Sequence, residues 1–544
     1  MSGSTHEVTN QTPPLTGHDV FGADPALVEA VARGATPRTL ADLTDLGRRA
    51  GGEHAQELGS RANSNPPVLR THDRYGHRVD EVEFDPAWHE LMTTAVEFGL
   101  HAAPWSSAAP DAHLRRAAGF VVWSQVEAGH LCPVSMTYAA VPALRADPAL
   151  AAEWEPRLSA TAYDFGLRPA AAKRGALAGM GMTEKQGGSD VRANTTRAEA
   201  LAVEGEYTLT GHKWFCSAPM SDVFLMLAQA RGGLTCFVVP RVLADGTRNT
   251  FRIQRLKDKL GNRSNASAEI ELDGTWARRL GLEGRGVATI IEMVSMTRLD
   301  CILGSTALMR SAVSQATHHA AHRTAFGGLL ADKSLMRNVL ADLAVESEAA
   351  TALAMRLAGA FDSDERDFRR LAVAVGKYWV CKRTPPLVGE ALECLGGNGY
   401  VEDSGLPRLY REAPLNSIWE GSGNVSALDV LRALTRESAA VEAYLAEVEL
   451  ARGADTRLDA ATDRLRKALT EVEEAGARRL VELMALVLQG SLLVRHAPAY
   501  VADAFTASRL AGDSDAGAWG HAFGTLPAGL DTASITTRAT PHPA

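Results

Sequence analysis

The spacing of hydrophobic positions changes twice along the chain, and each change predicts a different kind of structure. Up to about residue 175 apolar residues recur at helical spacing, as in Leu91, Met92, Ala95 and Val96. From about residue 176 the apolar runs become short and are separated by glycine, proline or aspartate. Helical spacing returns after residue 285 in a stretch without proline. The pattern predicts a helical domain, a β domain and a bundle of long helices.

The segment 268–273 shows the β pattern most clearly. Apolar Ala268, Ile270 and Leu272 alternate with acidic residues, which is the period of a strand with one face in water. Similar short runs at 207–211, 223–228 and 235–239 predict a compact antiparallel β domain that ends near Gly284. For the bundle, Leu335, Val339, Leu340 and Leu343 mark the stripe of a long helix.

The end of the chain predicts a fourth segment. About 75 residues beyond Arg436 again have helical spacing, and the tail from Gly512 is rich in Gly, Ala, Thr and Pro. We expect this tail to be loosely ordered or wrapped on the surface. The predicted domains are therefore 1–175, 176–284, 285–436 and 437–544. A chain of 544 residues, 46% hydrophobic and 22% charged, has the composition of an ordinary globular protein.

Charge and cysteine content narrow the class further. The formal charge of −9 repels a phosphate backbone on average, so a nucleic-acid site would have to be a local patch. The six cysteines are scattered without a Cys-x-x-Cys pair, which favours reduced thiols over disulfides or a zinc site. The polar N-terminus and the lack of a long uncharged apolar run predict a cytoplasmic protein without a membrane anchor.

Two glycine-containing segments near the β domain could bind a ligand. In Met180-Gly-Met-Thr-Glu-Lys-Gln-Gly-Gly-Ser-Asp-Val191, the glycines let a planar ligand approach, and Thr183 and Ser189 offer hydroxyls. On spacing alone, a plain glycine-rich turn is the better interpretation. In Gly211-His-Lys-Trp-Phe-Cys-Ser217, one of the two adjacent aromatics can face a ligand, although a buried core aromatic is the simpler interpretation.

A third segment places Glu420 between Trp419 and Gly421. Apolar surroundings would raise the pKa of this carboxyl toward neutrality, which suits a base that removes a weakly acidic proton. A Glu that caps a helix starting around Val425 is an equally good interpretation. A serine-hydrolase site at Gly421-Ser-Gly423 is excluded, because the nucleophile elbow needs Gly-x-Ser-x-Gly.

Together these segments resemble the acyl-CoA dehydrogenase family of flavoproteins, and within it the AidB branch. The resemblance covers nearly the whole chain and implies the α+β acyl-CoA dehydrogenase fold. This fold has a helical N-terminal domain, a central antiparallel β domain and a C-terminal helical bundle, with an extra helical C-terminal domain in this branch. The branch-specific motifs are Asn63-Ser-Asn-Pro-Pro67, Val126-Glu-Ala-Gly-His-Leu-Cys-Pro133, Gly179-Met-Gly-Met-Thr-Glu-Lys-Gln-Gly-Gly-Ser-Asp190 and Lys257-Asp-Lys-Leu-Gly-Asn-Arg-Ser-Asn-Ala-Ser267.

The resemblance also implies FAD as cofactor. Ser217 matches the hydroxyl that hydrogen-bonds flavin N5, and Phe215 stands where most members have the tryptophan that packs on the isoalloxazine. Glu393 stands where the family usually has Gln, and a carboxylate facing pyrophosphate is unfavourable. The implied FAD-binding residues are Met182, Thr183, Gly188, Ser189, Trp214, Phe215, Ser217, Arg323, Phe326, Gly396, Gly397, Trp419, Ser422 and Asn424, of which Arg323 reaches the FAD of a neighbouring subunit and Gly396 and Gly397 receive the neighbour's adenosine diphosphate.

The implied reaction is α,β-dehydrogenation of an acyl thioester carried by CoA or a carrier protein. Glu420 matches the family's base, which removes the α-proton while hydride leaves the β-carbon for flavin N5. Thr297 occupies the alternative position of the base, before Arg298, and cannot take a proton at neutral pH. Arg298, Trp419 and Gly421 are the implied substrate residues. The implied assembly is a homotetramer, and electrons would pass to an electron-transfer flavoprotein or to oxygen.

Because the AidB branch is also associated with DNA binding and alkylation resistance, a DNA-protecting flavoprotein with weak or vestigial dehydrogenation is the alternative function. Residues 436–544 contain eleven Lys and Arg against fifteen Asp and Glu, a net charge of −4 that opposes duplex binding. A solvated helix face is a simpler interpretation than a local basic ridge of Arg464, Arg466, Lys467, Arg478 and Arg479.

Three histidines, His318, His319 and His322, have a spacing that could hold a metal on one helix face. No carboxylate or cysteine lies nearby in the sequence to complete a ligand set. We therefore expect these histidines to lie on a helix surface or a subunit interface, and we expect no metal site.

Overall fold

The structure is a computed structural model of the chain and describes residues 5–512 and 521–541. It divides into two units. The β-containing unit is His54–Asp300, and the helical unit combines Met1–Glu53 with Cys301–Ala544. The boundary falls inside the longest helix, α9 (Gly286–His322), whose first part belongs to the β-containing unit and whose second part belongs to the helical unit.

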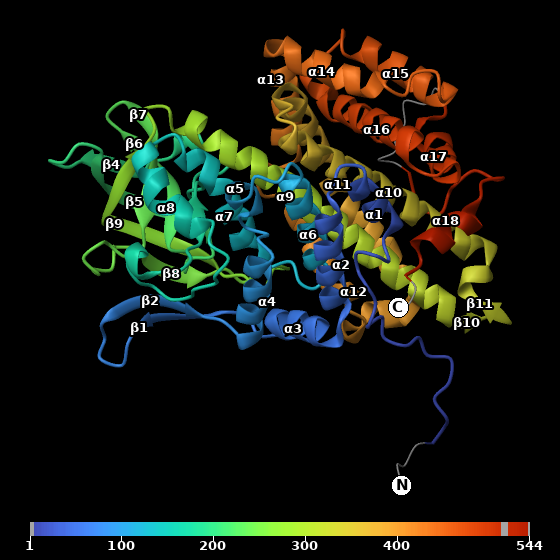
Figure 1. Cartoon of the computed structure of the whole chain (residues 1–544), viewed down its shortest axis with the longest axis horizontal. Coiled ribbons are helices and arrows are strands. Elements are labelled where there is room, and N and C mark those ends of the chain that lie inside the picture. The colour runs from blue at the N-terminus through green and yellow to red at the C-terminus, as the bar shows by residue number, and fades with distance from the viewer. Residues whose placement is uncertain (1–4, 513–520, 542–544) are drawn as a thin grey trace. The chain divides into compact units, whose positions relative to one another are not determined.

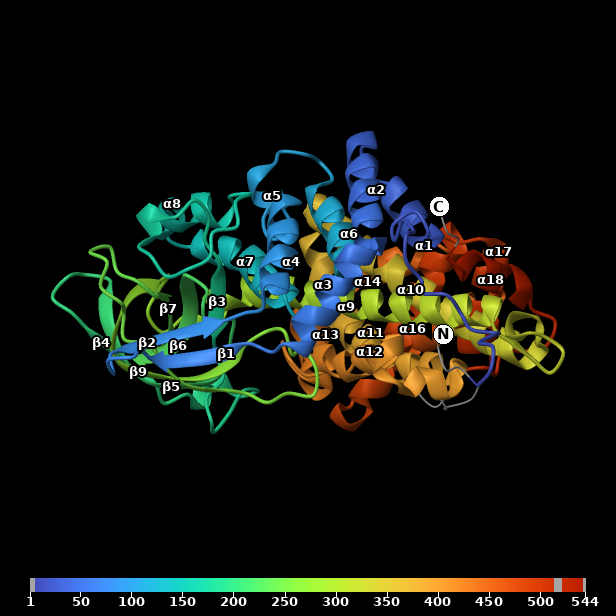
Figure 2. The ribbon, with the colours of Figure 1, turned by 90° about the horizontal axis from the view of Figure 1, so that it is seen from below.

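The β-containing unit begins with helices, as the apolar spacing predicts. Leu91, Met92 and Ala95 are fully buried on α4 (Pro86–Glu97), which starts with Pro86 and is capped by the Asp85 carboxylate. The sequence did not predict the antiparallel hairpin of β1 (Val68–His72) and β2 (Arg78–Glu83), which lie side by side in Figure 2. The other helices of this part are α3 (Glu53–Ser64), α5 (Ala103–Ser106), α6 (Ala112–Ser124), α7 (Leu131–Leu144) and α8 (Pro148–Leu158).

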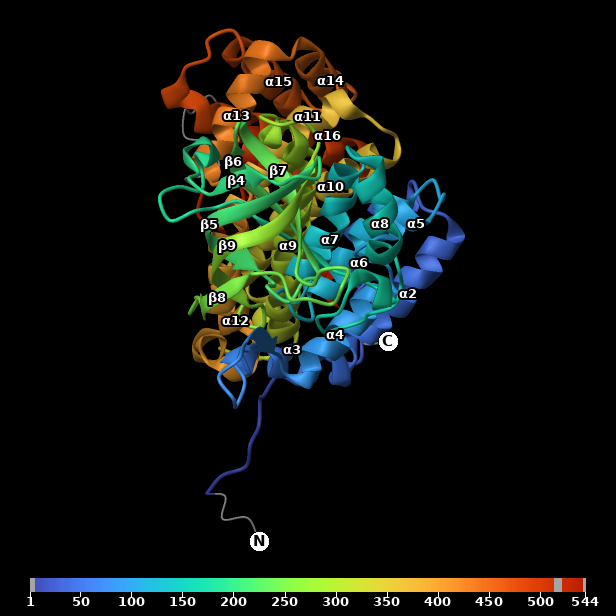
Figure 3. The same ribbon diagram turned by 90° about the vertical axis from the view of Figure 1, so that its left-hand side faces the viewer.

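Seven strands form the larger sheet of this unit. Their order is β3-β6-β4-β5-β9-β7, and β8 pairs with β9. Because β6 also pairs with β7, the strands close into a barrel, in which β5 and β9 run as long neighbours (Figure 3). Most pairs are antiparallel, but β3 and β4 add parallel pairings to β6. The strands are β3 (Ala178–Gly181), β4 (Arg197–Ala200), β5 (Glu206–Ser217), β6 (Val223–Ala230), β7 (Gly233–Pro240), β8 (Arg252–Leu256) and β9 (Ser267–Leu280).

The interior of the barrel confirms most of the predicted alternation on β9. Ala268, Ile270 and Leu272 are at most 2% exposed, and Glu271 and Asp273 face water. The acidic residue at the start of this run, Glu269, was expected in water but is buried, because Arg255 and Lys257 pair with its carboxylate. Burying such side chains contributes about 1.5–3 kcal/mol each for the larger ones. The same core holds β5 and β9 against each other at the end that carries Ser217.

Long helices form the helical unit, as predicted (Figure 1). α10 (Ser334–Asp362) packs on α11 (Arg366–Cys394), which also contacts α13 (Gly423–Arg436). α11 continues through Pro385 and Pro386. Leu340 and Leu343 of the predicted stripe are fully buried, but Leu335 is 84% exposed in the first turn of α10. The other elements here are α1 (Pro25–Ala32), α2 (Pro37–Gly51), β10 (Thr324–Ala325), β11 (Gly328–Leu329) and α12 (Leu406–Glu412).

The C-terminal segment is helical and packs on this bundle through α16, which contacts α10, α11 and α13. The predicted loose tail contains a helix, α18, whose Ile535 is buried and which packs on α10. Residues 513–520 and 542–544 of that tail lie outside the described residues. The helices of the segment are α14 (Ser438–Glu449), α15 (Thr456–Ala468), α16 (Ala477–His496), α17 (Ala499–Phe505) and α18 (Thr532–Ala539).

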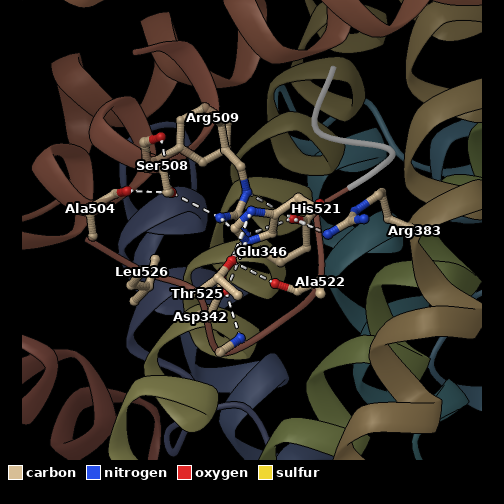
Figure 4. A network of polar contacts seen from close by, with 12 residues as sticks. Asp342, Glu346, Arg383, Ala504, Ser508, Arg509, His521, Ala522, Thr525 and Leu526 are labelled. Atoms are coloured by element: carbon tan, nitrogen blue, oxygen red, sulfur yellow. Dashed lines mark hydrogen bonds and ion pairs between the residues drawn. The ribbon is translucent and has the colours of Figure 1, made fainter. Parts of the chain in front are cut away.

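A buried ionic network joins the C-terminal segment to α10 and α11 (Figure 4). Arg509 Nη2 lies 2.5 Å from Asp342 Oδ1 and 3.1 Å from Glu346 Oε2. Arg383 donates to the same Glu346 oxygen at 3.1 Å, and His521 Nε2 lies 2.9 Å from Asp342 Oδ2. The two arginines balance the two carboxylates, so the network is neutral when His521 is neutral.

All six cysteines are buried and free, which agrees with the prediction of reduced thiols. Among the described residues, no helix has both the length and the apolar character that crossing a membrane requires.

Candidate functional site

Glu420 lies in a turn between a short 3-10 helix, Leu415–Ser417, and the start of α13. Its φ is +57°, and that of the following Gly421 is +99°. A side chain with a Cβ in this left-handed region costs about 1 kcal/mol, and such strain is concentrated at functional positions. The N-cap residue of α13 is Ser422, so the structure does not give the capping position to Glu420.

Side chains from two long helices hold this turn. Trp419 Nε1 donates to Asn416 Oδ1 at 3.0 Å, and Asn416 Nδ2 lies 3.2 Å from Ser305 Oγ on the second part of α9. On the other side, the carbonyl oxygen of Gly421 accepts a hydrogen bond from the Lys377 ammonium of α11. The backbone on both sides of Glu420 is therefore fixed.

The first turn of α13 contains the two last residues of the predicted FAD set, Ser422 and Asn424. Arg478 Nε of α16 donates to Asn424 Oδ1 at 2.8 Å. A residue of the C-terminal segment therefore reaches the candidate site, which the sequence did not predict.

In the β-containing unit, the glycine-rich loop after β3 is fixed by a buried ion pair. Glu184 Oε1 lies 2.8 Å from Lys213 Nζ, and neither side chain is exposed. Burial alone would raise the pKa of Glu184, but the Lys213 ammonium and hydrogen bonds from Thr195 and Thr196 lower it to about 2. The Trp214 amide donates to the Thr183 carbonyl at 2.8 Å, which joins this loop to β5.

The two adjacent aromatics lie where the register of β5 against β9 shifts, between Lys213 and Cys216. Lys257 Nζ is 3.2 Å from the centroid of the Trp214 ring and 4.6 Å from that of Phe215. Phe215 is 52% exposed, so it is not the core aromatic of the simpler interpretation. This cation–π contact stabilises the position of both rings.

Ser217 follows this shift at the end of β5. Its Oγ lies 3.4 Å from Ser267 Oγ, to which Lys259 Nζ donates at 3.0 Å. The motif 257–267 therefore supplies two lysines around the residue that is expected to contact flavin N5.

Two buried residues of the segment between α6 and α7, Glu127 and His130, support this motif. Glu127 Oε1 accepts from Ser264 Oγ at 2.8 Å, and Glu127 Oε2 accepts from the His130 amide at 2.9 Å. Burial would raise the pKa of Glu127, but its hydrogen bonds and the charge of His130 lower it to about 2. The motifs 126–133 and 257–267 are both specific to the branch, but the sequence did not predict that they contact each other.

The remaining predicted residues of the helical unit lie on a hairpin and a loop. Phe326, at the tip of the β10–β11 hairpin, is 95% exposed and has a φ of +50°. Asn10 holds the hairpin by hydrogen bonds to the Thr324 backbone, and its carbonyl accepts from Arg323. Gly396 and Gly397 begin the exposed 3-10 helix Gly396–Tyr400, and Glu393 is also exposed.

The histidine cluster differs from the expected helix surface. His318 and His319 are about 5% exposed, because residues 12 and 13 of the leader cover them. His318 Nε2 lies 2.9 Å from the Pro13 carbonyl, and His319 Nδ1 lies 3.0 Å from Thr12 Oγ1. No group of three His, Cys, Asp or Glu in the described part of the chain could hold a metal ion.

Within each unit, the structure thus brings part of the predicted set together. Met182, Thr183, Gly188, Trp214 and Ser217 lie on β5 and on the loop that it anchors. Trp419 to Asn424 form one turn at the start of α13. Ser189 is exposed on its loop, and Arg298 is partly buried on α9.

Comparison with known proteins identifies the family. Residues 10–165 match the family model described as the adaptive response protein AidB N-terminal domain. Residues 179–275 and 284–435 match the middle and C-terminal domains of acyl-CoA dehydrogenases. The chain belongs to the acyl-CoA dehydrogenase family, whose members depend on FAD, and it has that family's fold.

Two relatives and one solved structure place the chain within one branch. It is 46% identical to AidB, an acyl-CoA dehydrogenase homologue of Escherichia coli (strain K12), over 93% of this chain and 94% of that protein. It is 32% identical to acyl-CoA dehydrogenase family member 11 of Caenorhabditis elegans, over 90% and 85%. The crystal structure of Caenorhabditis elegans ACDH-11 in complex with C11-CoA has a TM-score of 0.84 at 28% identity, over 98% and 93%. The branch is that of AidB.

Proposed function

We propose that this protein is an FAD-dependent dehydrogenase of an acyl thioester, in which Glu420 removes the α-proton. The observation that carries the proposal is the strained turn at Glu420. Lys377 and Asn416 hold the residues on either side of Glu420. The backbone of Glu420 itself has a conformation that glycine would adopt more easily. A glutamate that is kept in this strained position, at a cost in stability, is typical of a residue with a catalytic role.

The residues of the predicted cofactor site fit FAD. A Cβ built on Gly396 or Gly397 meets no atom within 4 Å, so this exposed loop leaves room for a ligand to approach the backbone. Ser217 and Thr183 offer hydroxyls, and Trp214 and Phe215 offer ring faces beside a lysine. FAD, when bound, supplies the acceptor for the hydride.

The family and the C11-CoA ligand of the ACDH-11 structure support an acyl-CoA substrate. We propose an acyl-CoA thioester with Trp419 and Gly421 of the helical unit beside it. Glu420 lies in the turn before Ser422, the N-cap of α13, and in the proposed reaction its amide donates to the thioester oxygen while its carboxylate takes the α-proton. Lys377 fixes the Gly421–Ser422 peptide, which follows Glu420 in the turn.

Replacing Glu420 by Gln tests this role. The purified protein is mixed anaerobically with short, medium, branched and aromatic acyl-CoA thioesters, and loss of the oxidised-flavin absorbance is followed. We expect the wild type to be bleached by at least one thioester and the Glu420→Gln protein to keep FAD but react about 10²–10⁴ times more slowly. Glu442→Gln, an exposed site on α14, is the matched control. Unchanged bleaching by Glu420→Gln would remove Glu420 from the role of base.

The charges of the C-terminal segment favour this function over DNA protection. Its arginines are largely paired with carboxylates: Arg452 and Arg466 with Glu449, and Arg457 with Asp455. We expect duplex DNA to bind weakly near physiological salt and to be released as salt rises. A submicromolar dissociation constant near physiological salt in a gel-retardation titration would contradict this expectation.

We also propose a homotetramer, because exposed aromatics surround the residues expected to reach a neighbour's cofactor. Phe326 and Tyr400 are both more than 80% exposed, and large apolar side chains gathered on a surface mark an interface. Light scattering coupled to size exclusion gives the mass directly, and a monomeric mass at micromolar concentration would refute this assembly. Reoxidation of the reduced flavin by oxygen or by an electron-transfer flavoprotein identifies the acceptor.

A further inference from the structure

We infer that three cations at the start of α13 form a phosphate-binding site, and that the C-terminal segment contributes one of them. The cations are Lys377 and Lys382 of α11 and Arg478 of α16, here called the cation cluster. The inference deepens the proposed function. The identity of the bound phosphate ester rests on that function, whereas the site itself is argued from the three cations.

The three side chains converge on one short piece of backbone. Lys377 donates to the carbonyl of Gly421, and Arg478 donates to the side chain of Asn424. Gly423 lies between these contacts. A Cβ built on it would be 2.8 Å from Lys382 Cε, 3.5 Å from Lys382 Nζ and 3.4 Å from an Arg478 Nη atom. The absence of a side chain at Gly423 thus lets two cations reach the first turn of the helix.

Within the described residues, no carboxylate forms an ion pair with any member of the cation cluster. Lys377 is 1% exposed, and its ammonium has one hydrogen-bond acceptor, a neutral carbonyl. A buried ammonium without a counter-charge is costly, because water is lost and no opposite charge replaces it. Burial, Arg478 and Lys377, in that order, lower the pKa of Lys382, so the like charges repel one another. Glu482 lies one turn from Arg478 on α16, and Tyr378 is near both side chains.

An anion placed among these groups would relieve the repulsion. The first backbone amides of α13 point toward the same place, and Ser422, its N-cap residue, makes no side-chain capping bond. An arginine fork and lysine ammoniums are the groups that recognise phosphate oxygens. The phosphate ester is either the pyrophosphate of FAD or a phosphate of the acyl-CoA substrate, since Ser422 and Asn424 are expected to contact the first and Glu420 the second.

The test measures both ligands on the protein as purified. FAD release is followed by flavin fluorescence after dilution, and CoA binding is followed by calorimetry. The variants are Arg478→Met and Lys382→Met, and the control is Arg479→Met, the adjacent exposed arginine on the same helix. Arg478→Lys tests rescue, since it keeps the charge but loses the fork. Thermal melting reports folding, and removing a repelling cation should not lower the melting temperature.

Charge removal at Arg478 or Lys382 should weaken one ligand roughly tenfold, and Arg479→Met should change neither. Faster FAD release identifies the cofactor's pyrophosphate, and weaker CoA binding identifies the substrate's phosphate; either supports the site. Changes below twofold in both arms would overturn it. If the protein proves to bind no FAD, the proposed function fails while the CoA arm still tests the cation cluster. A wild type that binds neither ligand overturns both.

Discussion

Replacing Arg509 by Met is expected to destabilise the helical unit by about 3–5 kcal/mol, because it leaves buried carboxylates without their counter-charge. Asp342 and Arg509 are fully buried, and Asp342 accepts from both Arg509 and His521. Burial would raise the pKa of Asp342, but Arg509 and His521 lower it to about 2. Relative to an unfolded value near 3.9, this shift alone corresponds to roughly 2–3 kcal/mol.

The sign of the pH dependence follows from this lowered pKa. The stabilisation by Asp342 is fully present above about pH 4 and is lost as the pH falls toward 2. With roughly 300 residues in the helical unit, the entropy of unfolding is about 0.6 kcal/mol/K, so the melting temperature should fall by about 5–8 °C at neutral pH.

Thermal unfolding followed by circular dichroism and calorimetry measures this shift. Arg452→Met is the matched control, because Arg452 also pairs with carboxylates but is 36% exposed, and it should cost less than about 1 kcal/mol. The double variant Asp342→Asn with Arg509→Met should be more stable than Arg509→Met alone, since one unpaired charge is removed. A melting temperature of Arg509→Met within 1 °C of the wild type would refute the assignment of the network as a stabilising tether.

Three further outcomes are expected. Glu127→Gln should lower the free energy of unfolding by about 2–3 kcal/mol at neutral pH. Because the lowered pKa of Glu127 stabilises the fold fully only above about pH 4.5, the stability of this variant should also depend less on pH between about 4.5 and 2, which calorimetry across pH checks. Glu420→Gly should be about 1 kcal/mol more stable than Glu420→Ala in urea titrations, and equal stability would argue against strain at that φ. Gly399→Ala should destabilise by about 1–3 kcal/mol, since its Cβ would lie 2.0 Å from the Leu392 carbonyl oxygen, whereas Gly397→Ala has open space and should be near neutral in thermal melts.

Local periodicity predicted the elements well where one physical cause dominates. The alternation at Ala268, Ile270 and Leu272 became the buried face of β9, and the proline-free stretch after Val287 became long helices. The prediction for Leu335 was wrong: this residue lies in the first turn of α10, where fewer neighbours cover a side chain than in the middle of the helix. The parallel pairings of β3 and β4 with β6 are long-range, and no short window of sequence contains them.

The candidate site was predicted residue by residue only through the family resemblance. Whether Phe215 faces outward depends on the register shift in β5, and the burial of His318 depends on a leader more than 300 residues earlier in the chain. Lys257, Lys377 and Arg478 were missed because their partners are far away in sequence. A lysine or arginine in a motif gives no sign of its partner until the chain is folded.

The clamp formed by Asn10 has a practical consequence for anyone who prepares this protein. Its side-chain oxygen accepts from the Thr324 amide at 2.8 Å, its side-chain nitrogen donates to the Thr324 carbonyl, and its own carbonyl accepts from Arg323. A recombinant version that starts at residue 14, or a purification tag that displaces Asn10, would release the hairpin that bears Phe326. Cofactor retention and subunit assembly measured on such a version would describe a different molecule from the chain that keeps Asn10.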